Sequence, residues 1–167
     1  MLQVINKYSI ISVSLVLIQV LILNQIQFSG FVNPFIYILF VMLLPFTTPK
    51  YLLLPISFLL GLTIDVFSNS LGIHAAATTF IAYLRPALIG VISNRDKEKN
   101  DFPGLKQNGI QWFLLYTTVM VFFHHIVLFF LEIFSFTGFF YTIFKIIVSS
   151  FFSIFVIVLS QYIIFRD

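Results

Sequence analysis

The chain has 167 residues, of which 60% are hydrophobic and only 9% are charged, and its mean hydropathy is +1.06. An average soluble domain carries roughly 25% charged residues, so this chain has too few polar side chains to cover a water-soluble globule. The composition therefore excludes soluble enzymes, nucleic-acid-binding domains and disordered tails. It predicts an all-α integral membrane protein, because the apolar runs are continuous and lack the alternation of a membrane β-barrel.

The first fifty residues predict two membrane spans. The 42 residues between Lys7 and Lys50 carry no charge, and a single span needs only about 20. Turn-forming residues over 24–34 divide this stretch. We therefore expect a first span over residues 8–23, retained because no signal-peptide cleavage site follows it, and a second, short span over residues 35–46.

The remainder of the chain predicts four more spans and one hydrophilic loop. The spans are expected over residues 51–67, 71–92, 112–131 and 141–165, and the loop over residues 93–111. Residues 1–167 thus form a single polytopic domain with six transmembrane helices.

The distribution of basic residues predicts the orientation. If both termini are cytoplasmic, seven of the nine basic residues lie on the inner side, as the positive-inside rule requires. Lys145 is then expected towards the outer face, where its long side chain can extend to the head groups. The seven inner residues are Lys7, Lys50, Arg95, Lys97, Lys99, Lys106 and Arg166.

Asp65 is an ionisable residue at membrane depth and therefore needs a reason to be there. Gly61 lies four residues earlier on the same helix face, so another backbone can approach the acid closely. Two roles for Asp65 stay open. Its carboxylate could cap the following helix by accepting backbone N–H bonds, or it could contact a partner or ligand.

Arg85 and the histidines are the other polar groups expected inside the membrane. Arg85 lies about 20 Å from the outer end of its helix, too deep to pair with Asp65 in regular geometry, so we expect it to extend towards the inner head groups. His124 and His125 point about 100° apart on one helix and cannot bind one metal together. A hydrogen-bonded role is favoured for them, and for His74.

The usual patterns of catalysis do not occur in the sequence. Asp65 is the one aspartate within a predicted span, and there is no nucleophile elbow, zinc-binding helix motif or phosphate-binding loop. With no cysteine, thiolate chemistry and Cys-ligated metals are excluded. We expect a protein that is not an enzyme and has no cofactor or metal.

The central hairpin carries a recognisable pattern. Pro55, Gly61, Asp65, Gly72, His74 and Ala75 form P-x5-G-x3-D-x6-G-x-H-A, followed by Tyr83. This pattern resembles the signature of the rod shape-determining protein MreD family, which the chain also resembles in length, span number and orientation. The Phe-rich composition and Arg85-Pro86 depart from that family.

The resemblance implies a non-enzymatic subunit of the bacterial cell-elongation machinery in the cytoplasmic membrane. Such proteins bind MreC, a membrane-anchored protein, and through it link MreB filaments to the peptidoglycan polymerase RodA and its transpeptidase partner. The family fold is similar to the substrate-binding S components of energy-coupling factor vitamin transporters, and this gives the alternative function. The group Gly61, Asp65, Gly72, His74 and Tyr83 is then expected to bind the partner helix or to order the hairpin that does.

Two further expectations concern the loop and the oligomeric state. Arg95, Lys97 and Lys99, with Arg85, are candidates for contact with anionic lipid head groups or with filament proteins. Alternatively, the loop charges only enforce the membrane orientation. The sequence is compatible with a monomer beside its partner and with a symmetric homodimer.

Overall fold

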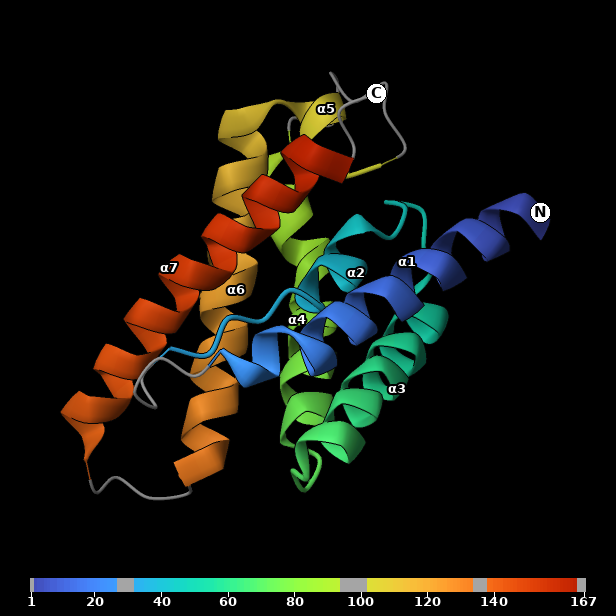
Figure 1. Cartoon of the computed structure of the whole chain (residues 1–167). Coiled ribbons are helices and arrows are strands. Elements are labelled where there is room, and N and C mark those ends of the chain that lie inside the picture. Colours follow the sequence, from blue (N-terminus) through green and yellow to red (C-terminus); the bar gives the residue numbers. More distant parts are fainter. Residues whose placement is uncertain (1, 27–31, 94–101, 134–137, 165–167) are drawn as a thin grey trace.

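Figure 1 shows the computed structural model of the chain, which describes residues 2–26, 32–93, 102–133 and 138–164. These residues form helices and no β-strand. Five segments are long and apolar enough to cross a membrane, namely Tyr8–Gln25, Lys50–Ser68, Ile73–Ile92, Ile110–Ile133 and Phe139–Ile163. The helices are α1 (Leu2–Leu21), the 3-10 helix η1 (Leu23–Gln25), α2 (Ile38–Leu43), α3 (Lys50–Ser68), α4 (Ile73–Ile92), α5 (Leu105–Asn108), α6 (Ile110–Ile133) and α7 (Phe139–Ile164).

The span predicted over residues 35–46 is wrong. Only the six residues of α2 are helical there, and six residues rise about 9 Å, far less than a hydrocarbon core of about 30 Å. Pro45 ends the helix because it holds the preceding Leu44 in an extended conformation. Every residue from Pro34 to Leu44 is buried, and α2 packs against α1, α4 and α6. The apolar run is therefore protein core and not a lipid-facing helix.

This buried segment nevertheless runs along the length of α1. Near the end of α1, the Gln19 side chain donates to the carbonyl of Pro34 at 3.1 Å and accepts from the amide of Ile36 at 2.8 Å. Near the start of α1, the Tyr8 hydroxyl donates to the carbonyl of Leu43 at 3.4 Å. Residues 34–43 thus run antiparallel to α1 and bring the chain back to the end where α1 begins.

The bundle has two ends, which we name by their residues. At the lysine end, which contains Lys50 and Lys106, the start of α6 meets the end of α4, since Trp112 Nε1 donates to Ser93 Oγ at 3.1 Å. At the hairpin end, the α3–α4 turn meets the end of α1, since Asn24 Nδ2 donates to Ser68 Oγ at 3.1 Å. Figure 1 shows the α3–α4 turn, the end of α6 and the start of α7 at the same end of the molecule.

Candidate functional site: the hairpin and its cavity

Asp65 organises the hairpin between α3 and α4. Gly72 occupies the N-cap position of α4 with φ +82° and has no side chain to cap the helix. The Asp65 carboxylate does this from seven residues upstream: Oδ1 accepts from the amide of His74 at 3.0 Å and from Ser70 Oγ at 2.6 Å, and Oδ2 accepts from the amide of Ala75 at 2.8 Å. The Asp65 carbonyl also accepts from the amide of Ser70 at 3.0 Å. One residue therefore binds both the end of α3 and the start of α4.

Gly61 allows the two helices of the hairpin to touch. A Cβ at this position would lie 2.5 Å from Ala75 Cα and 2.6 Å from the carbonyl oxygen of His74. Both neighbours are backbone atoms that cannot move aside without moving α4. The close helix contact at Gly61, the hydrogen bonds of Asp65 and the left-handed backbone of Gly72 thus order the hairpin. Capping of α4 by Asp65 is one of the two roles left open by the sequence.

His74 turns into the bundle, where it forms part of a buried chain of hydrogen bonds. The Tyr37 hydroxyl lies 3.0 Å from His74 Nδ1 and 2.7 Å from His124 Nε2. A single hydroxyl has one proton, so it donates to one imidazole and accepts from the other. Sequence analysis does not single out Tyr37, because this residue lies in the segment predicted as the second span.

His125 uses different partners from His124, because the two side chains point in different directions from α6. Its Nδ1 lies 2.8 Å from the carbonyl of Val121 and must donate the proton there, because a carbonyl only accepts. Its Nε2 therefore accepts from Ser153 Oγ at 3.1 Å, and Ser153 in turn accepts from the amide of Phe35 at 2.9 Å. Within the described ranges, no group of three or more His, Asp or Glu side chains is placed to hold a metal ion.

The buried tyrosine gives a direct test of this hydrogen-bond chain. Tyr37→Phe leaves one nitrogen each of His74 and His124 without a partner, and such a loss costs about 1–3 kcal/mol. We expect the free energy of unfolding in detergent micelles to fall by that amount. The exposed Tyr162 supplies the control, since Tyr162→Phe should change stability by less than about 0.5 kcal/mol. Equal stability of the two variants would contradict the assigned hydrogen bonds.

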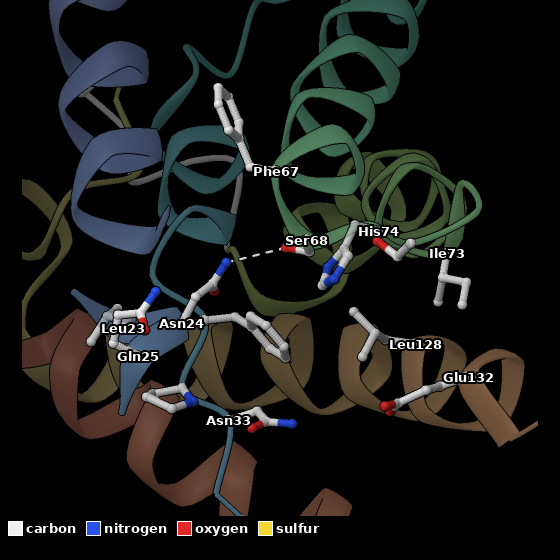
Figure 2. Close-up of a pocket in the computed structure, with 13 residues that line it drawn as sticks. Leu23, Asn24, Gln25, Asn33, Phe67, Ser68, Ile73, His74, Leu128 and Glu132 are labelled. Carbon is white, nitrogen blue, oxygen red and sulfur yellow. Dashed lines mark hydrogen bonds between the residues drawn. The ribbon is translucent and has the colours of Figure 1, made fainter. Parts of the chain in front are cut away.

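A cavity of about 340 Å³ adjoins the hairpin. Figure 2 shows its lining side chains, which come from η1, the extended segment before α2, the hairpin and α6. Its lining mixes amides and hydroxyls with apolar groups, which is the composition of a site for a small molecule. The polar lining residues are Asn24, Gln25, Asn33, Ser68, Ser70, His74 and Glu132.

Glu132 and Lys145 form an ion pair at the hairpin end, with 2.9 Å between Oε2 and Nζ. The ammonium also lies 4.5 Å from the centre of the Phe129 ring. The prediction that Lys145 extends to the head groups is therefore wrong. Its side chain is largely buried and points to an acid on the neighbouring helix, while the Glu132 side chain remains about half exposed.

The remaining predicted site residues lie away from the cavity. Tyr83 is 63% exposed on the outer face of α4. Arg85 is 1% exposed and does not extend out of the protein as expected, because its guanidinium donates to Tyr116 and to the carbonyl of Leu44 just beyond α2. It does not pair with Asp65, in agreement with the depths calculated from the sequence. Arg95, Lys97 and Lys99 lie outside the described residues.

These features define a class: an all-helical, multi-pass membrane protein with an acid-capped hairpin and a polar cavity beside it. Comparisons of the chain with protein-family models, curated proteins and solved structures found no match. Sequence analysis singles out Gly61, Asp65, Gly72 and His74, which the structure brings together in the hairpin. It missed the cavity residues Asn24 and Asn33, which were assigned only to a turn, although amides flanking an apolar span were a usable signal.

Proposed function

We propose that the chain is a non-enzymatic membrane subunit of the bacterial cell-elongation machinery, similar to MreD, which binds MreC. Through MreC it helps to couple MreB filaments to RodA and its transpeptidase partner. The observation that carries the proposal is the hairpin itself. The residues of the MreD-like pattern, Gly61, Asp65 and Gly72, act together in one small structure at one end of the bundle.

The hairpin offers a surface suited to a membrane-anchored partner. Leu71 at its tip is 99% exposed, and Val66 and Phe67 beside it are also exposed. On α4, Phe80 and Tyr83 point outwards. An apolar hairpin tip that a buried acid holds rigid can bind the transmembrane helix of a partner, together with the partner segment that leaves the membrane. Tyrosine is enriched among the residues that dominate such contacts.

The charges support a membrane orientation with both termini in the cytoplasm. Lys50 lies at the lysine end, and the predicted basic loop leaves α4 at Ser93 and returns at Phe102, also at this end. At the hairpin end the described lysine, Lys145, is neutralised by Glu132. The positive-inside rule then assigns the lysine end to the cytoplasm and the hairpin to the outer face of the bacterial cytoplasmic membrane.

Native mass spectrometry of the tagged chain, purified in mild detergent from its own membranes, tests the proposal. We expect a membrane-anchored protein with a large outer domain to co-purify in a fixed ratio. Tyr83→Ala should weaken this association about tenfold, the effect of losing an aromatic anchor. Tyr162→Ala removes another exposed tyrosine, on α7, and serves as the control. A chain that never retains such a partner would contradict the proposal.

The polar cavity favours a second candidate, the S component of a vitamin transporter. Its volume of about 340 Å³ and its mixed lining are those of a small-molecule site. The same experiment separates the two functions, because an S component should retain a vitamin-sized ligand or ATPase subunits. Asn24→Leu and Asn33→Leu should release such a ligand, whereas neither substitution should affect binding of MreC through the outer face of α4.

A further inference from the structure

We propose that a second cavity, at the lysine end, binds a phosphate oxyanion, either the head group of an anionic phospholipid or free phosphate. This cavity of about 330 Å³ lies between the start of α3 and the end of α4. Lys50 and Arg85 both line it, together with the hydroxyl-bearing Thr48 and Ser93, and no acidic residue lines it within the described part of the chain. The inference is independent of the cell-elongation proposal.

The charge of Arg85 is oriented but not neutralised by its protein contacts. Its Nε donates to the Tyr116 hydroxyl at 3.0 Å, and Nη2 donates to the carbonyl of Leu44. The backbone carbonyls of Met42 and Pro45 lie 3.5 Å from its terminal nitrogens. These acceptors are neutral dipoles, so they leave the full positive charge in place. The one ion pair among the described residues is the pair of Lys145 and Glu132 at the opposite end. A buried cation without a counter-charge is unfavourable at membrane depth, and an anion in the adjoining cavity would relieve it.

The surroundings of the cavity suit a phosphate group. Lys50 is exposed and is the first residue of α3, whose N-terminus has no side-chain cap, so the positive end of a 19-residue helix adds to the two cations. Arginine and lysine together are the usual ligands of phosphate in proteins. Ser93 directly follows the α4 span, so the part of the cavity that Ser93 lines lies at the level where lipid head groups begin.

The single tryptophan of the chain reports on this cavity. Trp112 Nε1 donates to Ser93 Oγ at 3.1 Å, and the Trp112 ring packs edge-on against Phe46 with 6.0 Å between ring centres. Ser93 and Phe46 both line the cavity. An anion that binds beside them should alter the indole hydrogen bond and therefore the emission of the protein.

The full chain in mild non-ionic detergent is titrated with phosphatidylglycerol, phosphatidylcholine or inorganic phosphate while tryptophan emission is followed. We expect a saturable change with phosphatidylglycerol or with phosphate, and none with phosphatidylcholine. Lys50→Gln should weaken the apparent affinity about fivefold, the effect of one lysine on an anionic head group. Lys106→Gln removes a charge at the same end but outside the cavity lining, and should leave the affinity unchanged.

The two anions distinguish the source of the phosphate. Saturation by phosphatidylglycerol at concentrations where inorganic phosphate has no effect assigns the site to lipid. Saturation by inorganic phosphate at concentrations where phosphatidylglycerol has no effect assigns it to free phosphate. As a second readout, native mass spectrometry counts the phosphatidylglycerol molecules that wild type and Lys50→Gln retain. The proposal is overturned if neither anion gives a saturable signal and lipid retention is equal, or if Lys50→Gln and Lys106→Gln weaken binding equally. Lys50 is exposed, so its substitution should not disturb the fold. The test therefore leaves the buried Arg85 unchanged.

Discussion

Replacing Asp65 by alanine is expected to lower the free energy of unfolding by about 3 kcal/mol. Three hydrogen bonds to the carboxylate disappear, and the amides of His74 and Ala75 are left without partners in a buried position, where each such loss costs about 1–3 kcal/mol. The start of α4 should fray, so hydrogen exchange at these two amides should accelerate while the middle of α4 stays protected. Equilibrium unfolding in mixed micelles measures the first effect, and exchange followed by mass spectrometry measures the second.

Two substitutions calibrate this result. Ser70→Ala removes one of the three hydrogen bonds and should cost about 1 kcal/mol. Glu132→Ala removes the other acid at the hairpin end, whose side chain is half exposed, and should leave exchange at the start of α4 unchanged. Membrane insertion of Asp65→Ala should be normal, whereas its association with the proposed partner MreC should weaken. A variant that unfolds like wild type, with unchanged exchange at Ala75, would show that the carboxylate does not cap α4.

The sequence predicted those features of the structure that depend only on the spacing of residues along one helix. The rise of 1.5 Å per residue placed Asp65 near one end of the bundle and Arg85 far from it, and the structure keeps the two residues apart. The same geometry predicted that His124 and His125 point about 100° apart, and in the structure the two side chains have separate partners. These are local properties, and a helix that is regular from end to end preserves them.

The sequence could not distinguish the two places where an apolar run can lie. A protein core and lipid tails are equally apolar, so composition alone made residues 35–46 a span. The prolines at 34 and 45 and the short length were the available warning. Once this segment was misplaced, the partners of Tyr37 were beyond reach, because His74 and His124 lie 37 and 87 positions away in the sequence.

The wrong prediction of a span over residues 35–46 also explains why the sequence predicts that Arg85 extends towards the inner head groups. Its principal acceptor is the carbonyl of Leu44, just beyond the end of α2. A short buried helix leaves its last carbonyls without intrahelical partners, and a guanidinium has enough donors to bind several of them. Without a helix end in the protein interior, the sequence offered no reason for an arginine to turn inwards.

Replacing Gly61 by leucine is expected to be at least as damaging as the loss of the Asp65 carboxylate. The first carbon of the new side chain would already lie 2.5 Å from Ala75 Cα, so α3 and α4 must separate along the hairpin. Overpacking of this kind costs about 1–3 kcal/mol, and here it also pulls the amides of His74 and Ala75 away from Asp65. We expect a loss of about 3 kcal/mol or more in the free energy of unfolding, and weaker association with the proposed partner MreC.

Ala76→Leu supplies the matched control, because it adds a similar bulk on the exposed side of α4, one residue from the contact. It should change stability by less than about 0.5 kcal/mol. The chain has no cysteine, so spin labels at Leu62→Cys and Phe80→Cys, both exposed, can follow the separation of the helices directly. We expect the distance between the labels to increase with Gly61→Leu and not with Ala76→Leu. An unchanged distance together with wild-type stability would mean that α3 and α4 do not touch at Gly61. The hairpin would then not be ordered by this contact, and the proposed partner site would lose its structural basis.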